Sequence, residues 1–379
     1  MHCNYFGVCG SCKTYELDYE EQIEKKKELT KELFSSLYPK STSSLPLTAH
    51  AENFDVFTSP SSNYRSRAEF RIWHEGDDLH YAMNKLEGKG VVLIDNCPKV
   101  TKDIEALMPE LRELIKKDSV LRDKLFSVEF LSSSTKVLVS LLYHKKIDES
   151  WDESARVLEE KLNISVIGRS RKVKRVLSDD FVIDTLHVAN KSYMFKIIEG
   201  GFSQPNSFVN VKMIEWVLSH IEETKDLLEL YCGHGNFSIP LSGKFRKVLA
   251  TEISKPSIKS AKDSCVMNNV ENIEFLRMSV EDLTSALNKE REFNRLKDFD
   301  LDSYDFSHVF VDPPRSGIDE KSLEFISQFD TIIYISCNPM TLKRDSEFLK
   351  DTFMIKDFAI FDQFPHTEHL ESGVILKKI

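Results

Sequence analysis

The sequence predicts an α/β protein with a C-terminal doubly wound, mostly parallel sheet and an N-terminal α+β unit. In the second half, short continuous apolar runs alternate with helical patterns, which is typical of strands buried on both faces between helices. In the first half, two segments instead have apolar residues at every second position, as half-buried antiparallel strands do. The length of 379 residues also favours two domains over one.

Composition narrows the class of protein. The 41% hydrophobic and 30% charged residues are typical of a globular chain and exclude a disordered one. No apolar run is long enough to span a membrane, and the first residues lack the basic and apolar regions of a signal peptide. We therefore expect a cytoplasmic protein without membrane contact and without an evident obligate protein partner. In that compartment its seven cysteines would be thiols or metal ligands rather than disulfides.

Three cysteines stand within the first dozen residues and a fourth follows before a proline: Cys3, Cys9, Cys12 and Cys97. Four thiolates can hold a zinc ion or a [4Fe–4S] cluster. Three close cysteines with a distant fourth favour the iron–sulfur cluster, because zinc sites commonly pair their cysteines in two short knuckles. Unligated thiols remain an alternative.

In the region 1–50, a helix followed by a linker is predicted after the cysteines. A Glu- and Lys-rich helix is expected over 15–37, with Ile23, Leu29, Leu33 and Phe34 as its buried side. The polar stretch "PKSTSSLP" after it is typical of a linker.

Residues 51–190 are predicted to form an antiparallel sheet with helices. Strands are expected at "FSVEFL", "KVLVSLLYH" and "ISVIG", with a helix at "WDESARVLEEKLN". In the first strand, the apolar residues Phe126, Val128 and Phe130 stand at alternate positions. The basic segment "IGRSRKVKRVL" concentrates positive charge, so a net charge of −10 does not exclude a nucleic-acid partner.

Residues 191–379 contain seven predicted strands: "DLLELY", "KVLATEI", "IEFLRM", "SHVFVD", "TIIYIS", "FAIFD" and "GVILKK". The last two leave no room for a helix between them, so they are expected to form a hairpin with an antiparallel final strand. A seven-stranded sheet of this kind is the Rossmann-like architecture of methyltransferases.

Ligands of open α/β sheets bind beyond the carboxyl ends of the strands. Gly233 and Gly235 form a turn after the first strand, Glu252 ends the second, and Asp312 ends the fourth before two prolines. Glu252 is placed to accept hydrogen bonds from two ribose hydroxyls. The sequence has no P-loop lysine after the turn and no third glycine of a dinucleotide fold. A cofactor without phosphates, S-adenosylmethionine, suits this pattern.

Two further residues suggest the chemistry. A lone cysteine is commonly an inert core residue, but Cys337 ends the fifth strand at the mouth of the expected site. Glu371, before the last strand, alone would be an ordinary turn carboxylate. A thiolate and a carboxylate together would suit one reaction of this cofactor, the methylation of carbon 5 of uracil. Carbon 5 becomes nucleophilic when a thiolate adds to carbon 6, and the adduct then needs a base to remove the carbon-5 proton. Asp312 or Arg315 could hold that base or stabilise the enolate oxygen.

From about residue 64 to the C-terminus the sequence resembles the RNA uracil-5-methyltransferase family, on the segments "YRSRAEFRIWHEGDDLHY", "LLYHKK", "IGRSRK", "FSQPN", "LLELYCGHGNFS", "VLATEISKPS", "REFNRL", "VDPPRSG", "YISCNP" and "FDQFPHTEHLESGV". Two of them, "FRIWHEGDDLHY" and "IFDQFP", are similar to the tRNA branch. The resemblance implies methylation of the T-loop uridine at tRNA position 54, with Cys337 as nucleophile and Glu371 as base. It implies cofactor contacts from Gln204, Tyr231, Asn236, Glu252 and Asp312.

The resemblance also implies that tRNA, or another structured RNA with a T-loop, binds the 51–190 region through Arg65, Arg67, Arg71 and Phe126. The stacked uridine must be flipped out, and Phe126 could replace its lost stacking. The cysteine spacing resembles the ribosomal RNA branch instead. Two alternatives therefore stay open: a 23S ribosomal RNA uracil-5-methyltransferase, which the tRNA-like segments disfavour, and a non-catalytic iron–sulfur RNA-binding protein, which Cys337 and Glu371 disfavour.

Overall fold

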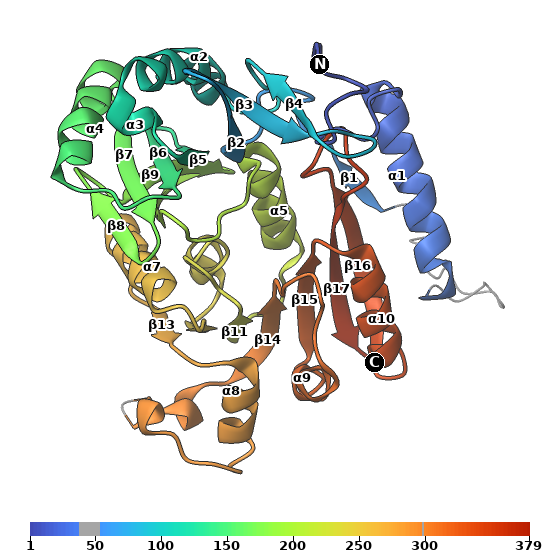
Figure 1. Ribbon diagram of the computed structural model, residues 1–379. Helices are drawn as coiled ribbons and strands as arrows, with labels where there is room; N and C mark the ends of the chain where they lie inside the picture. The colour runs from blue at the N-terminus through green and yellow to red at the C-terminus, as the bar shows by residue number, and fades with distance from the viewer. Residues whose placement is uncertain (38–53, 298) are drawn as a thin grey trace.

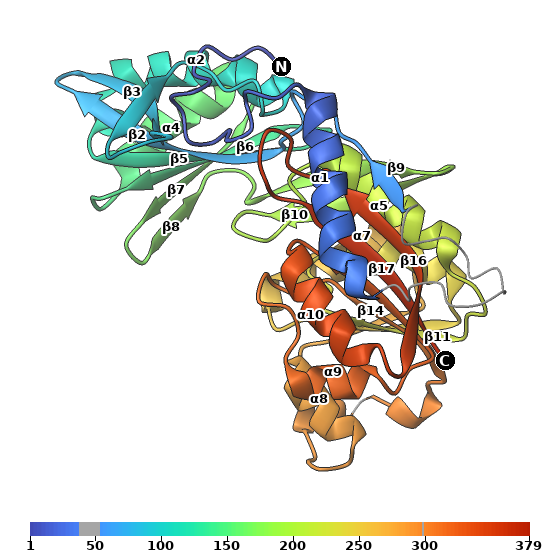
Figure 2. The ribbon, with the colours of Figure 1, turned by 90° about the vertical axis from the view of Figure 1, so that its right-hand side faces the viewer.

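The computed structural model describes residues 1–37, 54–297 and 299–379. The predicted linker "PKSTSSLP" lies outside the described residues. The described chain forms two large sheets with helices around them, the N-terminal sheet at one end and the C-terminal sheet at the other (Figures 1 and 2). Between them lies a two-stranded hairpin of β9 (Phe181–Val188) and β10 (Lys191–Ile198).

The C-terminal sheet has eight strands within the described residues, in the order β1-β16-β17-β15-β14-β11-β12-β13. The strands from β11 to β15 are parallel, whereas β17 runs antiparallel to both β15 and β16. Their bounds are β1 (Asp55–Phe57), β11 (Asp226–Leu230), β12 (Lys247–Thr251), β13 (Ile273–Leu276), β14 (Phe306–Val311), β15 (Thr331–Ser336), β16 (Phe353–Phe361) and β17 (Glu371–Lys378). The protein is thus α/β with a mixed sheet.

All seven predicted strands are present, including the antiparallel hairpin at the end, but the expected count of seven is wrong by one. The additional strand is β1, which pairs in parallel with β16 through Asp55↔Ala359. It was missed because a three-residue edge strand is too short to show a periodic pattern.

Helices cover both faces of this sheet. One face packs against α5 (Ser207–His220) and α7 (Lys255–Asn268), and the other against α9 (Glu320–Ile326) and α10 (Pro339–Leu349). Shorter helical segments complete this half: α6 (Ser238–Leu241), α8 (Val280–Leu287), η2 (Ser242–Lys244), η3 (Asn294–Leu296) and η4 (Leu301–Ser303). Because both faces are covered, the strands are continuously apolar rather than alternating.

The N-terminal sheet comprises seven strands in the part of the chain that is described, in the order β4-β3-β2-β5-β6-β7-β8. The strands are β2 (Arg67–Glu75), β3 (Asp78–Asn84), β4 (Val91–Ile94), β5 (Leu125–Ser132), β6 (Val137–Tyr143), β7 (Ser165–Ser170) and β8 (Val173–Val176), with helices α2 (Lys102–Lys117), α3 (Ser119–Arg122) and α4 (Glu149–Leu162). The prediction of an antiparallel sheet is wrong at one place, because β6 and β7 are parallel. The crossover helix α4 between them makes this possible.

The predicted alternation of β5 is also only partly correct. Val128 and Phe130 are buried, but Phe126 is exposed. The register between β5 and β6 shifts between Leu125 and Ser127. A bulge of this kind turns one side chain to the other face of a strand.

The N-terminal helix α1 spans Tyr19–Phe34 and is followed by a short 3-10 turn, η1 (Ser35–Leu37). It begins at a capping box, in which the Asp18 side chain accepts from the Glu21 N–H and the Glu21 side chain accepts from the Asp18 N–H. Figure 2 shows it running alongside α10 and in front of β16 and β17.

The predicted buried side of α1 is wrong for Leu29, which is 56% exposed. Ile23 and Phe34 are buried as expected, and the remaining buried residues are polar: Gln22, Lys26 and Thr30. No helix of the described residues has the length and apolar character needed to cross a bilayer.

Candidate active site

Cys337 and Glu371 meet at the carboxyl edge of the large sheet. Strand β15 ends at Ser336 and β17 begins at Glu371, and the register pairs Ser336 with Ser372. Cys337 therefore lies across from Glu371, one residue beyond the last paired residues. The hairpin between β16 and β17 brings the carboxylate to this position from the antiparallel side of β15.

Glu371 is removed from water, whereas Cys337 is partly exposed. Glu371 is buried, and its Oε2 atom has no hydrogen-bond partner among the described residues. Burial, reinforced by the nearby Asp312 carboxylate, raises the pKa of Glu371 well above its usual range. Burial, followed by the charges of Glu371 and Asp312, raises the pKa of the Cys337 thiol to about 11. An unpaired buried carboxyl beside a partly exposed thiol costs stability, and such perturbed groups are typical of functional sites.

Two features oppose the rise in the pKa of Cys337. Arg315 lowers it through its charge and a side-chain hydrogen bond. In addition, the thiol precedes Asn338, which caps α10 by accepting from the Met340 N–H at 3.1 Å, and the N-terminus of a helix stabilises a thiolate. The loop with Arg315 is fixed by the Asn338 side chain, which donates to the Arg315 carbonyl at 3.0 Å.

Cys337 lines an open cavity of about 750 Å³. One wall is the loop before Glu371, another is the start of α10, and a third is the side of α1 with Lys26, Leu29 and Leu33. A second cavity of about 310 Å³ shares Arg315, Glu368 and His369 with the first and reaches Lys13, Arg65 and Lys99. The thiol is therefore accessible from a groove with basic residues along it.

The predicted cofactor residues gather at the same edge. Tyr231, Glu252 and Asp312 each follow one of the adjacent parallel strands β11, β12 and β14. The turn after β11 has positive φ at Tyr231 (62°) and at Gly233 (55°), and a Cβ on Gly233 would meet nothing within 4 Å. That open space allows a ligand to approach the backbone.

The hydrogen bonds at this edge fit a ribose-containing ligand. The Gly233 N–H donates to Glu252 Oε2 at 3.2 Å, and the Ser254 N–H donates to Oε1 at 2.8 Å. Each carboxylate oxygen keeps further lone pairs for a pair of hydroxyls. Asn236 is buried and exchanges two hydrogen bonds with Asn210 of α5, so its amide is already paired.

Gln204 joins the cofactor edge to the catalytic loop. Its amide donates to Asp312 Oδ2 at 3.3 Å and its carbonyl accepts from the Gln363 amide at 2.9 Å. Burial raises the pKa of Asp312 to about 7, which the Gln204 hydrogen bond opposes. Gln363 lies in the 362–370 loop, which leads directly into Glu371.

A family described as tRNA (Uracil-5-)-methyltransferase matches this chain over residues 18–379. The chain belongs to that family. Two relatives, each named tRNA/tmRNA (uracil-C(5))-methyltransferase, are 52% identical to it: that of Aliarcobacter butzleri over 386 residues and that of a Sulfurovum species over 382 residues. In both cases the match covers 100% of each chain. This member of the tRNA (uracil-5-)-methyltransferase family is therefore an enzyme, as the sequence predicted.

The fold of this family member is also similar to a solved structure, that of the Pyrococcus abyssi tRNA (uracil-54, C5)-methyltransferase in complex with S-adenosyl-L-homocysteine. The TM-score is 0.71, with 22% sequence identity and coverage of 96% of this chain and 84% of that chain. At this identity the likeness supports the fold. It agrees with the α/β architecture and the mixed sheet described above.

The residues predicted to contact RNA differ in their exposure and in whether they already have partners within the protein. Arg67 forms an ion pair with Glu129 and donates to the Gly201 carbonyl, so it already has partners within the protein. Arg71 is exposed, and Arg65 lines the smaller cavity. Phe126 is exposed and stacks on His144 with ring centroids 4.3 Å apart.

The basic 169–175 segment is mostly neutralised. It forms the hairpin of β7 and β8, in which Arg169 and Lys174 pair with the buried Glu199, and Arg175 pairs with Asp152. Its positive charge is therefore less available to an RNA phosphate than the sequence suggested.

The four cysteines Cys3, Cys9, Cys12 and Cys97 line one small cavity of about 20 Å³. They are thus brought together from the N-terminus and the end of β4. Across the described residues, however, no group of three or more His, Cys, Asp or Glu side chains is arranged to hold a metal ion. The predicted iron–sulfur ligand set is not supported by this arrangement.

Sequence reasoning missed two residues of the site. Gln363 links Gln204 to the loop before Glu371, and only its place in "FDQFP" hinted at a role. Lys26 contacts the same loop from α1. Lys26 is one of several lysines in this helix. The signal that could have found it is its i,i+4 spacing from Gln22 and Thr30, because residues at that spacing lie on one side of a helix and here all three are buried.

Proposed function

We propose that this chain transfers a methyl group from S-adenosylmethionine to carbon 5 of a uridine in tRNA, the T-loop uridine at position 54. The observation that carries the proposal is the placement of Glu371 across from Cys337, with a buried carboxylate oxygen that has no partner among the described residues. A nucleophile and a base side by side are what carbon-5 methylation of uracil requires.

Each step can be assigned to a residue. Cys337 Sγ adds to carbon 6 of uracil, and the electrons of the C5=C6 double bond move towards carbon 5 and the carbonyl at carbon 4. Arg315 is placed to stabilise the developing negative charge. S-adenosylmethionine would supply an electrophilic methyl group to carbon 5, with S-adenosylhomocysteine as the leaving group. Glu371 then removes the proton from carbon 5, the C6–S bond breaks, the double bond re-forms and Cys337 leaves as a thiolate.

Gln204, Tyr231, Asn236, Glu252 and Asp312 are proposed to hold the cofactor. Glu252 would bind the ribose hydroxyls, since its two oxygens are already oriented by the Gly233 and Ser254 N–H groups. Asp312 would lie between cofactor and catalytic pair, because it contacts Gln204 and influences the pKa values of both Cys337 and Glu371.

The RNA target rests on the relatives. The P. abyssi enzyme is named for uracil 54 of tRNA, and the bacterial relatives are named for tRNA and tmRNA. We propose the same substrates here, with other T-loop RNAs as further candidates. Arg65, Arg71 and Phe126 would contact the RNA, whereas Arg67 would have to give up its ion pair with Glu129 to do so.

The division of the chain into 1–50, 51–190 and 191–379 remains a proposal, with RNA binding assigned to the middle part and catalysis to the last. A separate apolar core within the middle part, formed by residues such as Phe130, Leu141 and Trp151, supports it. The strand β1, at Asp55–Phe57, crosses this division by joining the large sheet.

Methylation of defined transcripts tests the function. With S-adenosylmethionine, the wild-type protein should form 5-methyluridine in a tRNA transcript, and a transcript carrying cytidine at position 54 should receive none. The Cys337→Ala variant should form no product and no covalent complex with 5-fluorouridine tRNA. Methylation of 23S ribosomal RNA with tRNA left unmodified would contradict the proposal.

The four cysteines are proposed as ligands of a [4Fe–4S] cluster with a structural or RNA-positioning role. Their donor chemistry suits such a cluster, whereas no group of three or more metal-ligating side chains is found in position among the described residues, and the methyl transfer itself needs no electron. Burial raises the pKa of Cys12 to about 11, and metal binding would therefore release protons. Anaerobically purified protein without iron would contradict the cluster.

A further inference from the structure

The loop 362–370 connects β16 to β17 and ends immediately before Glu371. Its first residue, Asp362, follows Phe361, which is paired with Glu371 in the hairpin register. The carboxylate of Glu371 therefore depends on the shape of this loop, because the loop sets where β17 begins.

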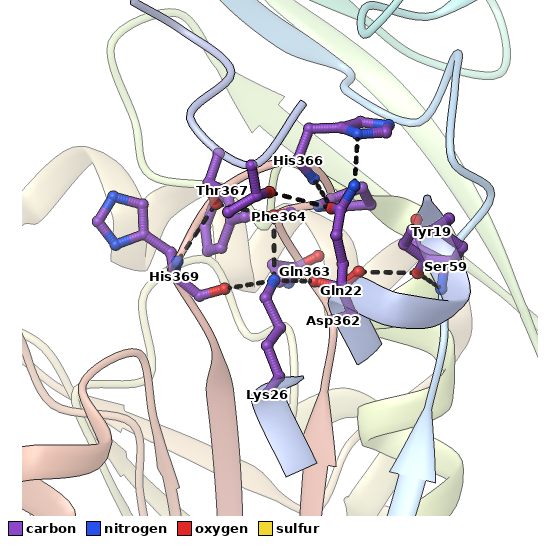
Figure 3. Close-up of polar contacts among 12 residues, drawn as sticks. Tyr19, Gln22, Lys26, Ser59, Asp362, Gln363, Phe364, His366, Thr367 and His369 are labelled. Atoms are coloured by element: carbon purple, nitrogen blue, oxygen red, sulfur yellow. Dashed lines mark hydrogen bonds and ion pairs between the residues drawn. The ribbon is translucent and has the colours of Figure 1, made fainter. Parts of the chain in front are cut away.

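The Lys26 side chain of α1 forms hydrogen bonds with this loop, as Figure 3 shows. The Lys26 ammonium donates to Asp362 Oδ1 at 2.6 Å, to the Phe364 carbonyl at 3.4 Å and to the His369 carbonyl at 3.0 Å. An ammonium has three N–H donors, and here the three acceptors lie at the start, in the middle and near the end of one loop. One side chain thus ties both ends of the loop together, two residues before Glu371.

This contact is buried. The side chains of Lys26 and Asp362 are 7% and 2% exposed. Two more residues of the same helix reach the loop: Tyr19 donates to Asp362 Oδ2 at 2.7 Å, and Gln22 accepts from the His366 N–H at 2.9 Å. Figure 3 shows these side chains pointing from α1 into the loop.

The loop also contacts the cofactor residues on its other side. Gln363, next to Asp362, donates to Gln204, which donates to Asp312. A shift of the loop would therefore move the base and disturb the contact between the catalytic loop and the cofactor edge together.

Stability alone does not explain a buried lysine at this position. Replacing a buried ion pair with apolar residues of similar size is often neutral or stabilising. The end of the helix shows that apolar packing is available to it, since Phe34 packs on Phe358 at a ring distance of 4.8 Å. What an apolar residue could not supply is three directed hydrogen bonds to a loop whose backbone must keep one conformation.

We propose that Lys26 is a positioning residue for proton abstraction, which holds the 362–370 loop so that the Glu371 carboxylate faces carbon 5 of the Cys337 adduct. The inference rests on the proposed function, since it presupposes the roles of Cys337 and Glu371. It assigns to the N-terminal helix a part in one defined step, after methyl transfer and before release of the thiolate.

The test compares Lys26→Met with Lys27→Met, a matched control on the same helix. Among the described residues Lys27 pairs with Glu24 alone, and that glutamate is exposed. Lys26→Met should trap 5-fluorouridine tRNA to the same extent as wild type, because trapping requires adduct formation and methyl transfer but no base. On ordinary tRNA its turnover should fall roughly ten- to hundredfold, and the covalent enzyme–tRNA complex should accumulate on denaturing gels. Lys27→Met should behave like wild type in both assays.

A merely structural role predicts a different result. Trapping and turnover would then fall in proportion to the folded fraction, with no accumulated adduct on ordinary tRNA, and that outcome would overturn the inference, as would turnover within twofold of wild type. If Lys26→Met does not fold, the double variant Lys26→Met/Asp362→Asn removes both buried charges, and the same criteria apply to it. Loss of trapping in Cys337→Ala is the separate test of the function, so normal trapping there would refute the proposed function rather than the role of Lys26.

Discussion

The carboxyl edge of the large sheet and the helix α1 contribute to one site in opposite ways. At the sheet edge, the reactive side chains project from the ends of strands whose own residues are apolar. In α1 two of the residues that hold the 362–370 loop, the polar Gln22 and Lys26, are themselves buried. The sheet fixes positions through backbone pairing, whereas the helix does so through side-chain hydrogen bonds.

The difference matters because mutations disturb backbone pairing and side-chain hydrogen bonds in different ways. A strand end can move only if the sheet is disrupted, and that costs many backbone hydrogen bonds at once. The 362–370 loop can change shape locally, since it is held by a few side-chain contacts to α1 and to Gln204. We therefore expect damage at the sheet edge to abolish chemistry, and damage at α1 to slow one step.

Glu371→Gln is expected to have the largest effect. Because the amide cannot accept the carbon-5 proton, turnover should fall by roughly 10²–10⁴-fold, while the covalent adduct with ordinary tRNA accumulates. Quench-flow and denaturing gels measure both. If the variant turns over normally, Glu371 is not the base, and the sheet edge does not supply it.

The pH dependence of turnover and of thermal stability provides a second test of Glu371 as the base. Only the ionised Glu371 can act as base, and burial raises its pKa, so wild-type turnover should fall as pH decreases at values above those that protonate an ordinary glutamate. A raised pKa in the folded state destabilises the fold as pH rises, since the unfolded carboxyl ionises more readily. Glu371→Gln should therefore melt above wild type at pH 8, by roughly 1–4 °C, and the difference should shrink towards pH 4.

Phe34→Ala separates stability from positioning within α1. Phe34 is 1% exposed and packs against Phe358, so its truncation should cost about 3–5 kcal/mol of unfolding free energy. Denaturant titration measures this cost. Turnover per folded molecule should stay close to wild type, in contrast to Lys26→Met. A cost below about 1 kcal/mol would show that the helix is not anchored by its apolar end.

Leu29→Ala is expected to have the smallest effect. Since this side chain is 56% exposed, its truncation should change the free energy of unfolding by no more than about 0.5 kcal/mol. The same titration provides the measurement. A cost similar to that of Phe34→Ala would restore the buried side that the sequence predicted for α1.

Much of the fold was predictable because apolar patterns report burial. The seven runs from 226 to 378 all became strands, and the short link before "GVILKK" correctly predicted the antiparallel hairpin. The meeting of Cys337 and Glu371 was predictable for the same reason, since both follow from strand ends. The different exposure of Phe126 and its alternate neighbours Val128 and Phe130 was not predictable from the alternation, because a bulge is a local shift that alternation does not reveal.

The polar part of the site was not predictable. The burial of Lys26 depends on acceptors 336 and 343 residues away in the chain, and no local pattern encodes a partner at that distance. The cysteines illustrate the reverse case: their spacing in the sequence suggested a ligand set, and the fold brings them to one cavity, but no group arranged to hold a metal ion is found among the described residues. Spacing alone fixes neither the distances between side chains nor their orientation.

The long separation between Lys26 and Asp362 has a consequence for how the chain is made. Synthesis starts at the N-terminus, so α1 leaves the ribosome well before β16 and β17 exist to cover it. An apolar face would meanwhile be a surface prone to aggregation. A face built around Gln22, Lys26 and Thr30 can remain hydrated until the last strands have been synthesised.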